Sequence, residues 1–471
     1  MSKKLNEMTI VEAARALRAR ECTVRELWDA CISNAETTNK QLNAFLEIFD
    51  ADETAIASAQ KRIDKNDSSL LCGIPLAIKD NILIEGKIAS AASKMLENYK
   101  ATYDATVIKK LKNAGALFVG RTNMDEFALG GSTENSAFGV TKNPHDISRV
   151  AGGTSGGSAA AVAAHMCIAA LGTDTGGSVR NPASYCGVIG LKPTYGAVSR
   201  SGIIAVASSF DQVGPIAKTV EDTRVLLDTI RGRDTLDSTT IADNLYPPRT
   251  ARKSLRIGVM RSLVEKDGID TGTRTIFNET LKKLESTGHA LIDLDIPLAD
   301  TALAAYYIIN FAEVSANLAR YDGIRYGHSA RGNTLLEDYI QSRTEGFGPE
   351  TRRRILLGTY VLSSGYIDAY YYKANAARAT LRMEFEKVFE SVDIIATPTM
   401  PTPAFKIGEK SDPLAMYLED IFTVTANLTG MPAISVPMGF VEREDKRLPV
   451  GVHFTAPHQA ENLLFAIGGA V

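Results

Sequence analysis

Glycine and serine are concentrated in one segment of the chain, and this segment limits the folds that the chain can adopt. Between Gly152 and Gly190 there are nine glycines, and most of them fall in two clusters, 152–158 (GGTSGGS) and 174–178 (DTGGS). Glycine adopts conformations that other residues avoid, and its missing side chain lets backbone approach closely. We therefore expect the backbone at both clusters to come close to another part of the chain or to a ligand.

Short apolar runs around these clusters indicate an α/β layer architecture, because strand patterns alternate with helical ones. Strand-like runs occur at LAIKDNI, ALFVGRTNM and CGVIGLKP, and they return at VDIIATPT, AISVPMGF and LPVGVHFTA. The most apolar run, Ala159–Leu171, is shorter than the ~20 residues needed to span a bilayer. We predict that it forms a buried core helix.

The sequence predicts one large domain, residues 1–471. Two T-x-x-E capping boxes, Thr9–Glu12 and Thr23–Glu26, predict helices near the start. The stretch Gly232–Lys253 is polar and contains prolines, but strand patterns lie on both sides of it. Residues 301–389 are expected to form several helices, with Tyr370, Tyr371 and Tyr372 on a packed face. The parts of the domain are N-terminal helices (1–69), a central part (70–231) and a second half (254–471).

Composition excludes several classes of protein. Lys and Arg total 52 against 55 Asp and Glu, so the net charge of -3 provides no basic field for direct RNA or DNA binding. The 5 cysteines lie far apart without a CxxC pair, which indicates buried thiols in a reducing compartment. The N-terminus lacks the apolar region of a signal peptide. We expect a cytoplasmic protein with no membrane association.

Two common glycine-rich sites do not match the pattern. A P-loop requires G-x-x-x-x-G-K-[ST], whereas the nearby Lys192 is followed by proline, which disfavours a nucleotide-binding protein. The G-x-S-x-G elbow of many serine hydrolases is absent around Ser155 and Ser178. We expect no bound metal, because the histidines have no metal-ligand spacing; they include His145, His165 and His289.

Lys79 is the other unusual residue, because it follows the apolar run of GIPLAIKDNI. Burial there would lower its pKa and leave it neutral enough to accept a proton. A lysine at a strand end can equally extend into solvent, and Ser155 and Ser178 can equally be turn serines that bond to loop backbone. Position alone leaves both interpretations open.

Three stretches together resemble the amidase signature family, in the order in which the family has them: GIPLAIKDNI, GGTSGGSAAAVAA and GTDTGGSVRNPASYCGVIGLKPTYGAVSRSGI. The resemblance implies the amidase signature fold, which is a central mixed β-sheet flanked by helices, with residues 70–231 as its signature core. It also implies hydrolysis of an amide by a serine nucleophile.

The resemblance further assigns roles to individual residues. Ser178 matches the nucleophile and Lys79 the general base, while the bridging serine, which follows a cis peptide in the family, matches Thr154. Threonine keeps the hydroxyl that passes the proton; Ser155 is the fallback and is otherwise expected to support this relay through hydrogen bonds. The expected oxyanion hole consists of backbone N–H groups of Thr175, Gly176 and Gly177.

Other segments resemble one branch of that family, the glutaminase subunits of tRNA-dependent amidotransferases: NMDEFALGGSTENSAFG, EGFGPETRRRILLGTYVLSSGY and DPLAMYLEDIFTVTANLTG. This implies that glutamine is hydrolysed to supply ammonia for converting Glu-tRNA(Gln) to Gln-tRNA(Gln), Asp-tRNA(Asn) to Asn-tRNA(Asn), or both. Arg354 and Asp420 match the residues that bind the α-carboxylate and the α-ammonium group of glutamine. The alternative is that Arg354 lies on an exposed helix face and Asp420 on the surface.

The same resemblance implies a heterotrimer. A B subunit would bind the misacylated tRNA and use ATP and magnesium, a small C subunit would wrap around both, and this chain would hold no cofactor. Other hypotheses are a stand-alone amidase that acts on small amides and, if Thr154 cannot relay protons, a scaffold with an inactive site.

Overall fold

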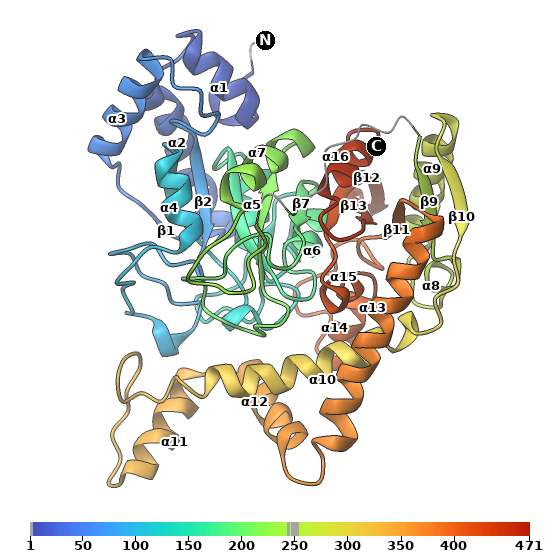
Figure 1. The fold of residues 1–471 in the computed structure, drawn as a ribbon. Coiled ribbons are helices and arrows are strands. Elements are labelled where there is room, and N and C mark those ends of the chain that lie inside the picture. Colours follow the sequence, from blue (N-terminus) through green and yellow to red (C-terminus); the bar gives the residue numbers. More distant parts are fainter. Residues whose placement is uncertain (1–2, 243–244, 246–253) are drawn as a thin grey trace.

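The computed structural model of the chain describes residues 3–242, 245 and 254–471. A mixed eleven-stranded sheet runs through the molecule in the order β1-β3-β2-β6-β8-β7-β12-β13-β11-β9-β10, with helices around it (Figure 1). This confirms the predicted α/β class. The strands of this sheet are β1 (Phe45–Ile48), β2 (Pro75–Lys79), β3 (Leu117–Thr122), β6 (Ala169–Asp174), β7 (Ile189–Lys192), β8 (Gln212–Ala217), β9 (Arg256–Val259), β10 (Ala290–Asp293), β11 (Ile394–Pro398), β12 (Ala433–Arg443) and β13 (Lys446–Thr455); β4 (Lys142–Asn143) and β5 (Asp146–Val150) form a separate hairpin.

Both predicted capping boxes are present at the first two α-helices. The hydroxyls of Thr9 and Thr23 accept backbone N–H groups, and the glutamates three residues later bond back to the cap backbone. The α-helices are α1 (Ile10–Arg18), α2 (Val24–Leu42), α3 (Glu53–Asp64), α4 (Thr106–Asn113), α5 (Gly156–Ala163), α6 (Arg180–Cys186), α7 (Val220–Ile230), α8 (Arg261–Val264), α9 (Thr271–Ser286), α10 (Ala299–Leu318), α11 (Leu335–Gly346), α12 (Pro349–Leu362), α13 (Lys373–Ser391), α14 (Pro413–Tyr417), α15 (Val424–Thr429) and α16 (Glu461–Gly468).

The sheet joins the two long parts of the chain. β7, from the central part, pairs antiparallel with β12, from the second half, and Gly190 lies opposite Ser435. This continuity supports the interpretation of 1–471 as one domain, which stays a prediction. The stretch Gly232–Lys253 is described only in part, since residues 243–244 and 246–253, with both of its prolines, lie outside the described residues.

The prediction of one buried helix over Ala159–Leu171 is wrong in its second half. α5 ends at Ala163, His165 has a left-handed backbone (φ 56°), and β6 begins at Ala169. β6 lies between β2 and β8 and is buried along its whole length, so its apolar run has no alternation that would distinguish it from a buried helix. In the described part of the chain, none of the helices combines the length and apolar composition needed to cross a membrane.

The sheet and α10 enclose the second glycine cluster. β2 and β6 are parallel, so their carboxyl ends lie at the same edge of the sheet, and α10 and α12 extend beneath the sheet in Figure 1. A Cβ at Gly176 would lie 2.3 Å from the Tyr306 hydroxyl oxygen of α10. Only glycine fits at 176 without displacing that tyrosine.

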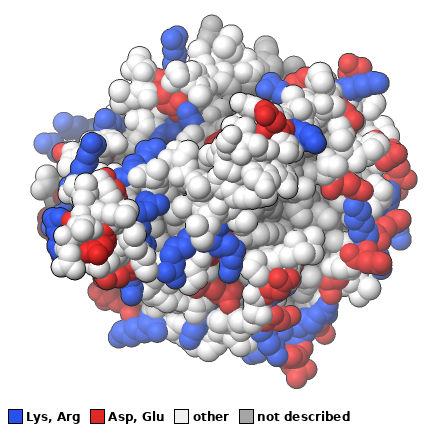
Figure 2. Space-filling view, turned by 90° about the horizontal axis from the view of Figure 1, so that it is seen from below, with Lys and Arg blue, Asp and Glu red and all other residues white. Residues whose placement is uncertain are grey.

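α11, α12 and the segment after α12, on the lower side of the molecule in Figure 1, carry many exposed apolar side chains. Figure 2 shows this side of the molecule, with a broad uncharged area at its centre. Of the three tyrosines predicted on a packed face, Tyr371 packs against the core, but Tyr370 and Tyr372 are 38% and 55% exposed, so the prediction is wrong for these two. We refer to this surface as the lower apolar face; it includes Leu335, Leu336, Ile340, Leu356, Tyr360 and Tyr366.

Candidate active site

Lys79 lies at the centre of a buried hydrogen-bonded cluster. It is the last residue of β2, and its Nζ donates hydrogen bonds to Thr154 Oγ1 (2.7 Å) and Thr173 Oγ1 (2.9 Å). Burial lowers the pKa of Lys79 to about 7, although the nearby carboxylates of Asp125 and Asp174 act in the opposite direction. A large fraction of this amine is therefore neutral near pH 7 and able to accept a proton.

Thr154 and Ser155 direct their hydroxyls to different partners. The Gly153–Thr154 peptide bond is cis, and the Thr154 hydroxyl meets Lys79. The Ser155 hydroxyl donates to the backbone oxygen of Thr173 (3.2 Å) and accepts from its N–H (3.3 Å). This geometry favours Thr154 as the relay and Ser155 as its support; both roles stay predictions.

Ser178 lies next to this cluster with a free hydroxyl. The N–H of Ser155 donates to the backbone oxygen of Ser178 (3.0 Å), which joins the two glycine clusters directly. Within the described residues, the Ser178 hydroxyl has no hydrogen-bond partner, so the final link of the predicted relay, Thr154 to Ser178, is not formed here. Catalytic hydrogen bonds commonly tighten only when substrate is bound. The side chain is 8% exposed, and therefore suited to a nucleophile in an enclosed site.

Asp174 shapes the loop that carries Ser178. Its carboxylate accepts hydrogen bonds from the N–H groups of Gly177 (3.0 Å) and Val179 (3.2 Å), and Arg180 forms a fully buried ion pair with it (2.9 Å). Burial alone would raise the pKa of Asp174, but Arg180 holds it below its usual range. The carboxylate therefore stays charged and fixes the loop.

This arrangement changes the expected oxyanion hole. The N–H of Gly177 already donates to Asp174, so it does not point freely into the site. Among the described residues, the loop N–H groups without a hydrogen-bond partner are those of Thr175, Gly176 and Ser178. We infer that these three, rather than Thr175, Gly176 and Gly177, are the donors available to a developing oxyanion.

Arg354 is buried, unlike its neighbours. It is 3% exposed, whereas Arg352 and Arg353 are exposed, so the exposed-helix-face alternative does not hold for Arg354. Its Nε donates to Glu350 Oε1 (2.8 Å) and its Nη1 to Asn310 Oδ1 (3.3 Å). Burial alone would lower the pKa of Arg354, but Glu350 keeps it above its ordinary value, so the guanidinium is always charged.

Asp420 and Arg354 both contact Tyr307. The Tyr307 hydroxyl donates to Asp420 Oδ2 (2.6 Å), and the Arg354 guanidinium lies 5.5 Å from the centre of the Tyr307 ring. Burial raises the pKa of Asp420 to about 7, against the effects of Tyr307 and Arg354. One turn later, Thr423 Oγ1 donates to the backbone oxygen of Gly176 (2.6 Å), which ties this pair to the Ser178 loop.

The structure also describes the cysteines and the possible metal ligands. All five cysteines are buried free thiols, which confirms that prediction: Cys22, Cys31, Cys72, Cys167 and Cys186. Over residues 3–242, 245 and 254–471, no group of three or more His, Cys, Asp or Glu side chains could hold a metal ion.

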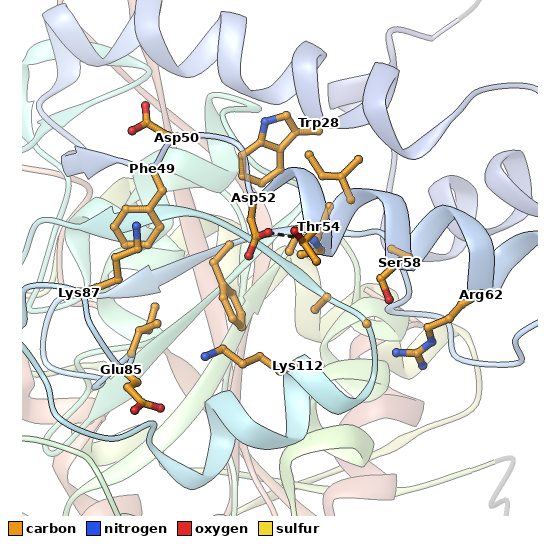
Figure 3. Close-up of a pocket in the computed structure, with 18 residues that line it drawn as sticks. Trp28, Phe49, Asp50, Asp52, Thr54, Ser58, Arg62, Glu85, Lys87 and Lys112 are labelled. Carbon is orange, nitrogen blue, oxygen red and sulfur yellow. Dashed lines mark hydrogen bonds between the residues drawn. The ribbon is translucent and has the colours of Figure 1, made fainter.

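A separate cavity of about 480 Å³ lies beside α3 and the start of β3 (Figure 3). None of the predicted site residues lines this cavity. Its basic side chains are engaged with the protein: Arg62 pairs with Asp67 and Lys112 with Asp104, both at 2.7 Å, and Lys87 lies over the Phe49 ring. Because these groups do not converge on one point, the Lys79 cluster is the better candidate for an active site.

Fold and site together define an amidase. Residues 26–465 match the family model described as Amidase, and the chain belongs to that family. It is 47% identical to the A subunit of the glutamyl-tRNA(Gln) amidotransferase of Desulfatibacillum aliphaticivorans, over 98% of this chain and 96% of that protein. The protein of the same name from Thermoanaerobacter pseudethanolicus is 48% identical, over 99% and 96%. The crystal structure of the corresponding A subunit from Thermotoga maritima matches with a TM-score of 0.82 at 42% identity, covering 100% of this chain and 95% of that one.

Thr154 provides the sharpest test of the relay. We expect Thr154→Ser to retain or raise the rate of glutamine hydrolysis, since the hydroxyl that bonds to Lys79 is kept. Thr154→Val keeps the shape and removes the hydroxyl, so its rate should fall by roughly 10²–10⁴, the range typical of proton-transfer catalysis. Thermal unfolding controls for stability. A valine variant as fast as the wild type would move the relay to Ser155 or to water.

Proposed function

We propose that this chain is the glutaminase subunit of a tRNA-dependent amidotransferase. It hydrolyses glutamine, and the ammonia converts Glu-tRNA(Gln) to Gln-tRNA(Gln), Asp-tRNA(Asn) to Asn-tRNA(Asn), or both. The observation that carries the proposal is the buried Lys79–Thr154 hydrogen bond beside the Ser178 loop. The amidotransferase name of relatives at 47% and 48% identity supports it.

The chemistry follows from three side chains. Ser178 Oγ attacks the side-chain amide carbon of glutamine, and its proton passes through the Thr154 hydroxyl to neutral Lys79. The loop N–H groups stabilise the negative oxygen. The carbon–nitrogen bond then breaks, the leaving nitrogen takes up the proton, and ammonia departs. Water next attacks the γ-glutamyl ester, which releases glutamate and restores Ser178.

Arg354 and Asp420 would recognise the two charges of glutamine. In the described residues, Arg354 Nη2 and Asp420 Oδ1 have no hydrogen-bond partner, although both side chains are otherwise held in place. A guanidinium suits the α-carboxylate, and a carboxylate suits the α-ammonium group. Substrates that lack either charge would leave Arg354 Nη2 or Asp420 Oδ1 without a hydrogen-bond partner, which disfavours simple amides.

We further propose that the chain acts in the cytoplasm, with a B subunit that binds tRNA and uses ATP and magnesium and with a C subunit. We propose no cofactor in the chain itself. The nearly balanced charge of this chain suits a subunit that does not hold tRNA. The lower apolar face also supports the proposal, because exposed apolar patches commonly mark surfaces that partner proteins cover.

Co-purification from the native host, followed by an assay of the isolated material, tests the proposal. We expect two partner proteins to accompany the chain and the complex to release ammonia from glutamine. The complex should also form Gln-tRNA(Gln) or Asn-tRNA(Asn) from the misacylated tRNA when ATP and magnesium are added. A chain that purifies alone and hydrolyses small uncharged amides faster than glutamine would identify a stand-alone amidase instead.

A further inference from the structure

Glu126 is a buried carboxylate outside the catalytic cluster, and it joins three distant segments. It is 2% exposed. Its Oε1 accepts the Ser93 hydroxyl (2.5 Å), while its Oε2 accepts the N–H of Gly348 (2.8 Å) and the Thr351 hydroxyl (2.5 Å). The last two residues lie at the first turn of α12.

This carboxylate contacts the N-terminal end of α12. The residue at its N-cap is Gly348, which has no side chain, and Pro349 follows it. A Cβ at position 348 would lie 2.6 Å from Glu126 Oε2, so glycine leaves the space that the carboxylate fills. A negative charge at a helix N-terminus is favourable, because unsatisfied N–H groups point outward there. Glu126 therefore anchors the start of α12 from another segment of the chain, through the Gly348 N–H and the Thr351 hydroxyl.

The same helix carries Arg354, and Asp125, the neighbour of Glu126, lies against the backbone just before Thr154: a Cβ at Gly153 would lie 2.3 Å from Asp125 Oδ2. Thr351 and Arg354 are three residues apart, so they lie on one side of the helix. Asp125 accepts the N–H of Thr133 (2.8 Å) and acts electrostatically on Lys79. The dipeptide Asp125–Glu126 thus connects the chemical centre to the helix that bears Arg354.

Aromatic packing reinforces this connection. The ring of Phe127 lies 5.6 Å from that of Phe347, the residue before Gly348. The Ser93 hydroxyl is also within hydrogen-bond distance of the backbone oxygen of Gly346 (3.2 Å). Packing and hydrogen bonds therefore act together to hold the start of α12 against Ser93 and the segment 126–127.

From these contacts we infer that Glu126 is a positioning residue for the α-carboxylate subsite, which sets the distance of Arg354 from Ser178 by anchoring the first turn of α12. The inference rests on the proposed glutaminase function. A small shift of Arg354 would weaken the hold on glutamine while the Lys79–Thr154–Ser178 chemistry stays intact.

The test measures glutamine hydrolysis by the assembled complex that carries Glu126→Gln, which keeps the shape and removes the charge. We expect KM for glutamine to rise by about 10- to 100-fold with kcat within about threefold, since misplacing a binding group by around 1 Å can have effects of this size. Thr351→Val removes one α12 contact and should shift KM in the same direction but less. The matched control is Asp222→Asn, at another buried carboxylate, which accepts the N–H of Val11 rather than any group of α12; its KM should not change.

A double-mutant cycle separates positioning from general destabilisation. If Glu126 acts through Arg354, the double variant Glu126→Gln with Arg354→Ala should have nearly the same KM as Arg354→Ala alone. A double variant whose rise in KM equals the product of the two single rises would overturn the inference. An unchanged KM for glutamine in Glu126→Gln would also overturn the inference. Equal losses of kcat in all variants, accompanied by lower unfolding temperatures, would overturn it as well. If the wild-type complex does not hydrolyse glutamine, the proposed function itself fails, and this outcome is distinct from the others.

Discussion

Replacing Ser178 with alanine should abolish glutamine hydrolysis by the complex. The loss should be on the order of 10⁶-fold, as for removal of a serine nucleophile elsewhere. The fold should survive, because Ser178 lies in a loop held by Asp174 and makes no side-chain hydrogen bond within the described residues. Amidation of misacylated tRNA with added ammonia should continue, since that step bypasses glutamine.

The measurement is ammonia release from glutamine, together with labelling by a γ-glutamyl electrophile. We expect the electrophile to form a covalent adduct with the wild type and none with Ser178→Ala. Ser148→Ala, at an exposed serine outside the cluster, serves as the matched control and should behave as the wild type. An adduct on the Ser178→Ala chain would show that another residue is the nucleophile.

Lys79→Ala should be about as damaging as loss of the serine, because residues that act as one unit give strongly non-additive losses. Lys79→Arg should not rescue activity, since a guanidinium does not give up its proton at working pH. Lys192 provides a control: it is also buried, burial likewise lowers its pKa to about 7, and its Nζ donates to the backbone oxygen of Pro193 instead of to Thr154 or Thr173. Lys192→Met should change stability far more than the rate. An active Lys79→Arg enzyme would contradict the neutral-lysine mechanism.

The pH profile gives a second readout for Lys79. As the pH falls below about 7, Lys79 gains the proton that prevents it from acting as a base, and Asp420 gains one that prevents it from binding an ammonium group. Both effects have the same sign, so kcat/KM for glutamine should rise from pH 5 and level off above about 7. A flat profile between pH 5 and 8 would contradict the mechanism.

Parts of the fold were predictable because their signals are local. The capping boxes at Thr9 and Thr23 involve residues three positions apart, so sequence alone identifies both helix starts. Ala159–Leu171 was not predictable in the same way. A buried central strand and a buried helix have similar apolar runs, and only the place of β6 between two other strands makes it a strand.

For the candidate site, the sequence by itself determined the components: two glycine clusters, a lysine after an apolar strand, and hydroxyl residues at 154, 155 and 178. It also placed Arg354 and Asp420 among the candidates, through the family resemblance. Each of these depends on residue type or on near neighbours in the chain.

Only the tertiary structure decided how these components are used. It turned the Gly177 N–H toward Asp174, buried Arg354 while its neighbours stayed exposed, and brought Tyr307 between Arg354 and Asp420. Sequence patterns alone do not single out Tyr307 or Thr173, although the acidic residue directly before TGGS was a usable signal for Asp174. The physical reason is that these contacts join segments far apart in the chain, and their geometry is set by strand register and helix packing rather than by local preference.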